Sequence, residues 1–347
     1  MPPPTEPAVW STRFCSQLLT EPVADDPVSV VDRLLAVQAQ DPRAMRLSIR
    51  SRTTGVVATD VDRALTDDRS LVVTWLNRGT LHLVTATDYW WLHPLTAPRF
   101  VTWNRTRLRQ EGVTETDEAR GVALVTDAVV AGPHTRAELR TIFDDAGIPT
   151  GGQALHHLLV AASIEGDVVR GPVVDGDLAY VSASRWLGPP PPPLSTGEAL
   201  ARLGERYLAA HAPAEPADLA KWAGITLIAA RHALGQLDPA AASSEQPDDN
   251  PPRWPAPRLL GGFDPILHGW ADRTGITGGH RDIVTTNGIF RPIGLVDGRA
   301  VATWGLAGGS VTINPLEEIT PAALGALERD ADGVISFFGT TTRPATD

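Results

Sequence analysis

Two glutamines, Gln38 and Gln40, stand two residues apart in the segment VQAQDP at residues 37–42. An amide side chain donates and accepts hydrogen bonds, but it transfers no proton at neutral pH. The pair could therefore hold a water molecule or a polar ligand and align dipoles with a developing charge, without acting as acid or base. The alternative is structural, because polar residues at a helix end can hydrogen-bond only the turn that follows.

The elements that must position these amides are two successive helices. Apolar residues recur at helical spacing from Val30 to Val37, so we predict a helix over residues 30–40 that the glutamines close. Asp41 is then the expected N-cap and Pro42 the first residue of a second helix, over residues 43–52. Asp41 could instead act as a general base, which makes it a possible supporting residue of the same site.

Basic residues follow the glutamines directly. Arg43, Arg46 and Arg50 are spaced at i, i+3 and i+7, so they share one face of the second helix. Such a face suits contacts with phosphate groups. The alternative is a solvated helix face with no ligand.

Further along the chain, two more groups of residues could contact a ligand. Arg105 and Arg107 lie near Trp103, which suits contacts with a phosphate backbone, although an interdomain helix fits the same pattern equally well. Arg78 and His82 flank an expected hairpin turn. His82 alternates with apolar residues, so it is either a hydrogen-bonded structural histidine or a catalytic one.

The composition is that of a globular protein with several compact units. The 347 residues include 42% hydrophobic and 20% charged residues. A net charge of −11 argues against a uniformly basic surface, although the arginines are clustered. A single cysteine, Cys15, permits neither an internal disulfide nor a cysteine zinc site, and no apolar run has the length of a membrane span. We therefore expect a cytoplasmic protein without metal, cofactor or membrane partner.

Proline-rich segments and changes in periodicity divide the chain. Five consecutive prolines at residues 189–193 must be extended and act as a spacer. A second break, residues 243–257, is rich in proline and aspartate. We expect four units, at residues 1–112, 113–188, 194–242 and 255–347.

The second of these units has the clearest pattern. Three helical segments, with a capping box at Thr135 and Glu138, precede two β-rich runs joined by Asp175-Gly176. This is the order of a winged helix, and the first and third units repeat it less clearly. The fourth unit has the short β-rich runs and glycine turns of a small antiparallel β-barrel. The predicted fold class is α+β, with three tandem winged-helix units followed by this barrel.

Four sequence blocks together carry a family resemblance. They are VQAQDP at residues 37–42, WLNRGTLHLV at 75–84, LLGGFDP at 259–265 and NGIFRP at 287–292. In this order they resemble the AlkZ/YcaQ superfamily of winged-helix bacterial DNA glycosylases. The resemblance implies a C-shaped protein that excises alkylated bases from DNA. We expect it to act as a monomer, at the nucleoid, on double-stranded DNA that carries alkylated purines. Gln-x-Gln is typical of the AlkZ-like branch, in which the motif is catalytic, so the resemblance assigns that role to Gln38 and Gln40.

The neutrality of these amides implies a restricted substrate. A site without a general acid should release only bases that are already good leaving groups, such as cationic N7-alkylpurines. In the AlkZ-like branch the expected lesions are bulky or crosslinking natural-product adducts, in DNA repair and antibiotic self-resistance. The competing interpretation is a noncatalytic winged-helix regulator or adduct-binding protein, which is favoured if the negative charge keeps the protein off undamaged DNA.

Overall fold

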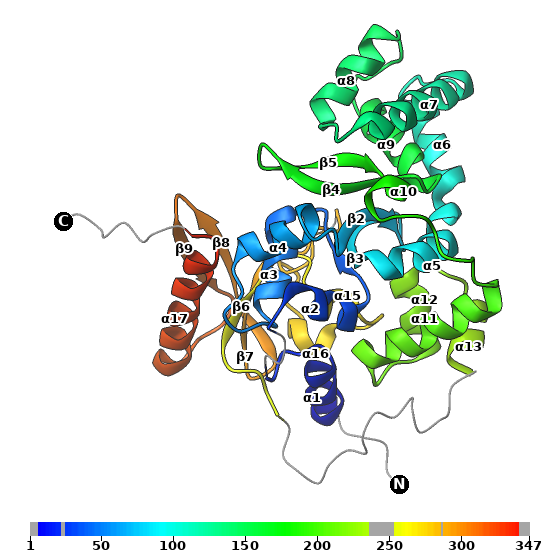
Figure 1. Cartoon of the computed structure of the whole chain (residues 1–347). Coiled ribbons are helices and arrows are strands. Elements are labelled where there is room, and N and C mark those ends of the chain that lie inside the picture. The colour runs from blue at the N-terminus through cyan, green and yellow to red at the C-terminus, as the bar shows by residue number, and fades with distance from the viewer. Residues whose placement is uncertain (1–5, 22–24, 236–252, 286, 340–347) are drawn as a thin grey trace. The chain divides into compact units, whose positions relative to one another are not determined.

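A computed structural model describes residues 6–21, 25–235, 253–285 and 287–339. The chain divides into two compact units. Unit 1 comprises residues 1–61, 201–222 and 226–347, and unit 2 comprises residues 62–200 and 223–225. Figure 1 shows helices and antiparallel strands in each, which confirms the predicted α+β class. In the described ranges no helix is both long and apolar enough to cross a membrane.

Unit 2 contains two β-hairpins that form one antiparallel sheet. Its strands are β2 (Leu71–Leu76), β3 (Thr80–Thr85), β4 (Val168–Val174) and β5 (Asp177–Ser182). They lie in the order β3-β2-β4-β5. Each hairpin turn begins with a residue at positive φ, Asn77 at 49° and Asp175 at 51°, and a glycine follows within two residues. These are the turns that the Asn-Arg-Gly and Asp-Gly sequences predicted.

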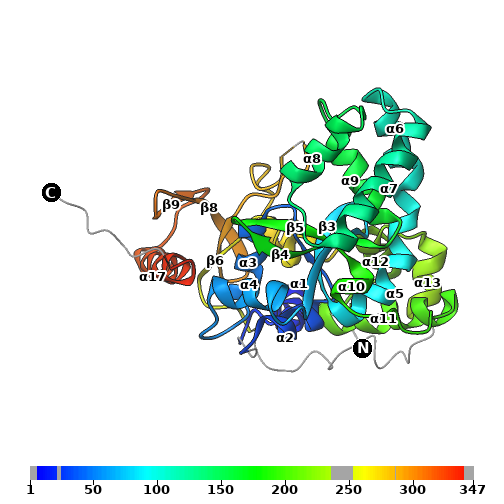
Figure 2. The same ribbon diagram turned by 45° about the horizontal axis from the view of Figure 1, so that its top comes forward.

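Helices pack against this sheet and against each other. They are α5 (Ala86–Thr96), the 3₁₀ helix η1 (Ala97–Phe100), α6 (Val101–Gln110), α7 (Glu115–Ala131), α8 (Arg136–Asp145), α9 (Ala154–Ile164) and α10 (Ala183–Trp186). Helix α9 contacts both α6 and α7 (Figure 2). Helix α8 adds to the core that they share, which includes Val125, Phe143 and Leu158, all fully buried. The predicted capping box begins α8, since Thr135 and Glu138 bond reciprocally.

Unit 1 holds the first helices of the chain and most of the C-terminal half. Its helices are α1 (Glu6–Ser16), α2 (Pro27–Leu34), α3 (Pro42–Arg50), α13 (Leu227–Gly235), α15 (Pro265–His268), α16 (Thr274–Thr277) and α17 (Pro321–Phe337). Three more, α4 (Ala58–Thr66), α11 (Thr196–His211) and α12 (Pro216–Ala223), contain points where the chain passes between units. Most of the second predicted break, residues 243–257, lies outside the described residues.

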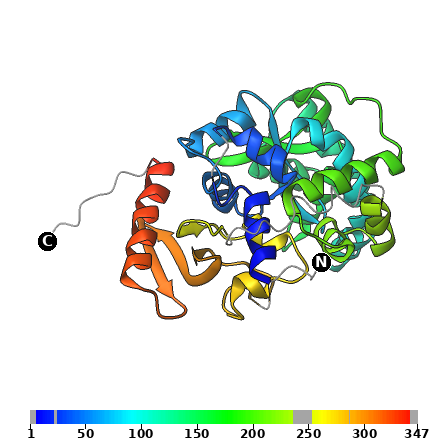
Figure 3. The same cartoon turned by 90° about the horizontal axis from the view of Figure 1, so that it is seen from below.

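The sheet of unit 1 corrects the predicted β-barrel. Its strands are β6 (Arg258–Leu260), β7 (Ile293–Val296), β8 (Arg299–Ala307) and β9 (Ser310–Pro315), in the antiparallel order β6-β7-β8-β9. Among the described residues this sheet is open, with β6 and β9 as its edges. Helix α17 packs beside it (Figure 3) and contributes Leu327 and Val334 to a core with Leu47 and Trp304. Because a helix buries the face of the sheet, closure is not needed.

The helix predicted over residues 30–40 is also wrong in its length. Helix α2 ends at Leu34, and Leu35 caps it with φ at 66°. The chain then becomes extended as strand β1 (Val37–Gln38). Gln38 therefore lies in a short strand rather than at a helix end.

Candidate active site

The two predicted glutamines contact each other. Gln38 Nε2 donates a hydrogen bond to Gln40 Oε1 at 2.5 Å. In an extended chain, side chains at i and i+2 point to the same face, whereas in a helix they do not. The end of α2 at Leu34 is thus what allows the two amides to meet.

This contact leaves one amide oxygen without a partner. Gln38 is only 7% exposed, and its Oε1 accepts no hydrogen bond from the described residues. A buried acceptor without a donor costs about 1–3 kcal/mol, which a bound water or ligand donor would relieve. Gln40, in contrast, is exposed. The hydrogen bond therefore links Gln38, which has a buried acceptor, to Gln40, whose amide solvent or a ligand can reach.

Asp41 caps the next helix, as predicted. Its Oδ1 accepts hydrogen bonds from Arg43 N at 2.8 Å and Ala44 N at 3.2 Å, and Pro42 is the first helical residue. The cap fixes the direction in which the chain leaves Gln40 and enters α3. A general-base role for Asp41 remains a prediction.

The three arginines of α3 differ in their surroundings. Arg43 is exposed, and its Nη1 donates to Leu306 O at 3.2 Å. Arg46 is buried and donates to Pro42 O at 2.8 Å. Arg50 forms a bidentate ion pair with Asp330 of α17, with distances of 2.8 and 3.1 Å. Of the predicted basic face, Arg43 is the guanidinium best placed to contact a solvent-borne phosphate.

The decisive observation for the family is a match over most of the chain. Residues 31–337 match the sequence model of the DNA glycosylase AlkZ-like family. This chain belongs to that family. It is 27% identical, over 379 residues and 97% of each chain, to an interstrand DNA cross-link repair glycosylase of Streptomyces sahachiroi. The solved structure of Streptomyces sahachiroi DNA glycosylase AlkZ has a similar fold, with a TM-score of 0.77 at 24% identity over 98% of both chains.

Membership of the AlkZ-like family confirms the resemblance carried by the four sequence blocks. Three of these blocks, VQAQDP, LLGGFDP and NGIFRP, lie in unit 1. The second contains Asp264, an aspartate that sequence reasoning did not single out. Asp264 forms a fully buried ion pair with Arg52, just beyond the end of α3. The sequence could have pointed to Asp264, because this residue lies in one of the family blocks. Nothing in the sequence pointed to Asp330, the ion-pair partner of Arg50.

The predicted residues of the first hairpin belong to unit 2. His82 lies in β3 opposite Thr74 of β2, is 3% exposed, and has Nδ1 2.9 Å from Thr80 O. Burial, together with the positive charge of Arg78, lowers the pKa of His82 to about 3. His82 is therefore neutral at physiological pH and holds no proton to donate as an imidazolium, which favours its structural interpretation.

Helix α6 presents the other predicted arginines of unit 2. Arg105 pairs with Glu118 at 3.2 Å but is still 49% exposed. The Arg107 guanidinium lies 5.7 Å from the ring centre of Trp103, whose side chain is 44% exposed. An exposed indole beside guanidinium groups is a surface that can stack a base and contact phosphates. Within the described parts of the chain, no cluster of three or more metal-ligating side chains is found.

Proposed function

We propose that this protein hydrolyses the N-glycosidic bond of cationic N7-alkylpurines in double-stranded DNA, acting as a monofunctional glycosylase and a monomer. The physiological lesions would be bulky or crosslinking natural-product adducts, in DNA repair and self-resistance. Membership of the AlkZ-like family supports the reaction class. The name of the Streptomyces sahachiroi relative, an interstrand DNA cross-link repair glycosylase, supports the lesion class.

The observation that carries the proposal is the unpartnered Oε1 of Gln38. It is a buried acceptor, bound through its own amide group to Gln40. A water molecule that donates to this oxygen would be held beside the exposed end of the pair. Most glycosidases use two carboxylates, one of them to protonate the leaving group. Neutral amides can orient the water and direct carbonyl dipoles at positive charge, but they cannot protonate a base.

The proposed reaction needs no general acid to protonate the leaving base. The bond between C1′ and the purine N9 breaks, and its electron pair neutralises the cationic base, which leaves uncharged. Positive charge develops on the sugar ring, where amide carbonyl dipoles stabilise it. The oriented water adds its oxygen to C1′ and releases a proton to solvent. The product is an abasic site.

DNA would be held by arginines on both units. We assign contacts with the DNA backbone to Arg43, Arg46, Arg50, Arg78, Arg105 and Arg107. Arg43 and Arg107 are the strongest candidates, since both are exposed, whereas Arg105, although exposed, is paired with Glu118. Arg50 would have to exchange its ion pair with Asp330 for a phosphate.

The proposal also includes the finer fold assignment, three winged-helix units at residues 1–112, 113–188 and 194–242 and a C-terminal β-domain at 255–347. The order α7, α8, α9, β4, β5 supports the second of these units, because three helices precede a hairpin. In such units the third helix commonly contacts DNA. Here α9 is buried along nearly its whole length, so the exposed arginines of α6, rather than α9, are the proposed DNA contacts of unit 2.

The test compares the protein with Gln38→Ala and Gln40→Ala variants on a duplex that carries N7-methylguanine. Abasic sites are converted to strand breaks by alkali, and duplex binding is measured separately. We expect each variant to bind DNA normally but to release base about 10²-fold more slowly, the order found when one transition-state hydrogen bond is lost.

An Asn314→Ala variant is the matched control, because Asn314 is an exposed amide residue of β9 in unit 1 and is not assigned to catalysis or DNA contact. Equal strand breaks from the protein and both motif variants would remove the glutamines from the mechanism. Binding to the duplex without any base release by the unaltered protein would favour the noncatalytic regulator.

A further inference from the structure

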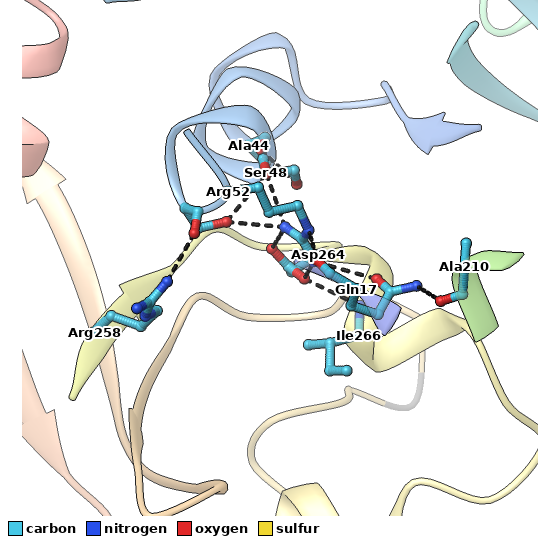
Figure 4. A network of polar contacts seen from close by, with 9 residues as sticks. Gln17, Ala44, Ser48, Arg52, Ala210, Arg258, Asp264 and Ile266 are labelled. Carbon is cyan, nitrogen blue, oxygen red and sulfur yellow. Dashed lines mark hydrogen bonds and ion pairs between the residues drawn. The ribbon is translucent and has the colours of Figure 1, made fainter. Parts of the chain in front are cut away.

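The C-terminal end of α3 is anchored by a polar network inside unit 1 (Figure 4). Arg52 and Asp264 are both 0% exposed and form a bidentate ion pair, with distances of 2.8 and 2.9 Å. Arg52 also donates to Ser48 O, Ser51 Oγ and the backbone and side-chain oxygens of Gln17. Every donor group of this guanidinium is therefore used.

The network joins four segments of unit 1. Asp264 Oδ1 accepts from Ile266 N and so caps α15. Gln17, just beyond α1, donates from Nε2 to Ala210 O near the end of α11 at 2.8 Å. Arg258 of β6 donates to Ser51 O at 2.8 Å. The last turn of α3 is thus tied to α1, α11, α15 and β6 at once.

Close backbone packing holds the middle of α3 as well. A Cβ added at Gly261 would lie 2.9 Å from Leu47 Cβ and 3.1 Å from Ala44 O, so only glycine allows this approach. Gly261 and Asp264 belong to the same sequence block, LLGGFDP. One segment therefore contacts α3 through its backbone and fixes its end through a carboxylate.

A buried ion pair contributes little to stability for its size, because two charges lose their hydration. A pair of apolar residues could fill the same space, but apolar contacts have no preferred direction and would fix the position of α3 less precisely. A bidentate pair between a planar guanidinium and a carboxylate does define it. What this geometry fixes is the helix whose N-cap, Asp41, directly follows Gln40.

We infer that Arg52 and Asp264 are positioning residues for the Gln38–Gln40 pair. They act through α3, a nine-residue helix with the glutamine segment at its start and the ion pair just past its end. If α3 shifts or tilts, Asp41 and the preceding amides move with it, and the water-binding oxygen loses its alignment. The inference deepens the proposed function and rests on it for its effect on rate. Its effect on the glutamine segment can be measured without catalysis.

Two variants separate a positioning role from a role in folding. Asp264→Asn keeps the shape and an acceptor for Ile266 N but removes the charge that pairs with Arg52. The double variant Arg52→Met, Asp264→Leu removes both charges together, a change that proteins often tolerate without loss of stability. Tyr207→Phe is the matched control, because it removes a buried hydrogen bond of the same unit, from the hydroxyl to Gly269 O at 2.6 Å, that involves neither Arg52 nor Asp264.

Each variant is measured by hydrogen–deuterium exchange over residues 36–44, duplex affinity and single-turnover release of N7-methylguanine. We expect faster exchange in both network variants but not in Tyr207→Phe. Both network variants should bind the duplex with unchanged affinity. They should release the base about 10²-fold more slowly, as expected when a catalytic group is misplaced by roughly 1 Å. The double variant is decisive, since it should lose alignment while staying folded.

Unchanged exchange over residues 36–44 in a folded double variant overturns the inference. So does a release rate that falls only in proportion to the folded fraction, as in the control. If the unaltered protein releases no base, the proposed function fails on its own, and the exchange measurement still decides whether the network positions the amides.

Discussion

At neutral pH, Gln38 and Gln40 carry no charge and exchange no proton, so the chemistry available to them is limited to hydrogen bonds and dipoles. Their spacing was readable from the sequence, and so was the Asp41 cap, because both depend on local residue types. Their mutual hydrogen bond was not. It requires an extended backbone at Gln38, and the apolar periodicity of residues 30–37 indicated a helix there.

At the scale of single residues, substitutions of Asp41 test whether this residue acts as an N-cap or as a general base. Asp41→Ser keeps an N-capping oxygen but removes the carboxylate, whereas Asp41→Ala removes both. As an N-cap, Asp41 predicts that the serine variant keeps its base-release rate and that the alanine variant loses about 1 kcal/mol of unfolding free energy. Denaturant unfolding and single-turnover release measure the two. A stable serine variant with little activity would instead identify Asp41 as the base.

At the scale of elements, the sequence predicted the strands and the helix–hairpin order better than the ends of helices. Helix α2 ends because Leu35 adopts φ of 66°, a conformation that is unfavourable for leucine and that tertiary packing must offset. Helix α17 was missed although Thr320 and Pro321 form an N-terminal signal, because the surrounding runs were β-rich. The open sheet of unit 1 depends on that missed helix, since α17 covers its face.

The α3 arginines provide the prediction for this scale. Arg43→Gln should reduce the slope of log affinity against log salt by about one unit, because an exposed phosphate contact is lost. Arg50→Gln should change this slope less than Arg43→Gln, and it should also lower the unfolding free energy, since it leaves Asp330 without its 2.8 Å partner. Duplex titrations at several salt concentrations and denaturant unfolding measure these effects. If only the Arg50 variant changed the salt dependence of DNA affinity, the phosphate contact would have to be assigned to Arg50, on the side of α3 that faces α17.

At the scale of the whole molecule, the chain combines an acidic total charge with exposed arginines on particular helices. The net charge of −11 was known from composition, but which arginines are free of ion pairs was not. That depends on contacts between residues as distant as Arg50 and Asp330. The burial of histidines could not be predicted from the sequence either, because it depends on tertiary packing.

Buried histidines predict how stability responds to acid. Burial lowers the pKa of His82 and His211 to about 3 and of His93 and His156 to about 4. Below the unfolded value of about 6.5, the unfolded chain binds protons that the folded chain does not, so the folded state loses stability as pH falls toward 4. Denaturant unfolding at pH 7.5, 6 and 5 should show this decline. His93→Gln should lessen the slope by about one proton, and a flat profile in the unaltered protein would contradict the burial.

The central claim is that a site built on neutral amides acts only on bases that are already cationic. It is tested most directly by single-turnover release of N7-methylguanine and of uracil from duplexes matched in sequence, with the same enzyme preparation. We predict release of N7-methylguanine, and no release of uracil above the rate of the Gln38→Ala variant. Release of both bases at comparable rates would contradict it, because uracil is neutral and needs help to leave that these amides cannot supply.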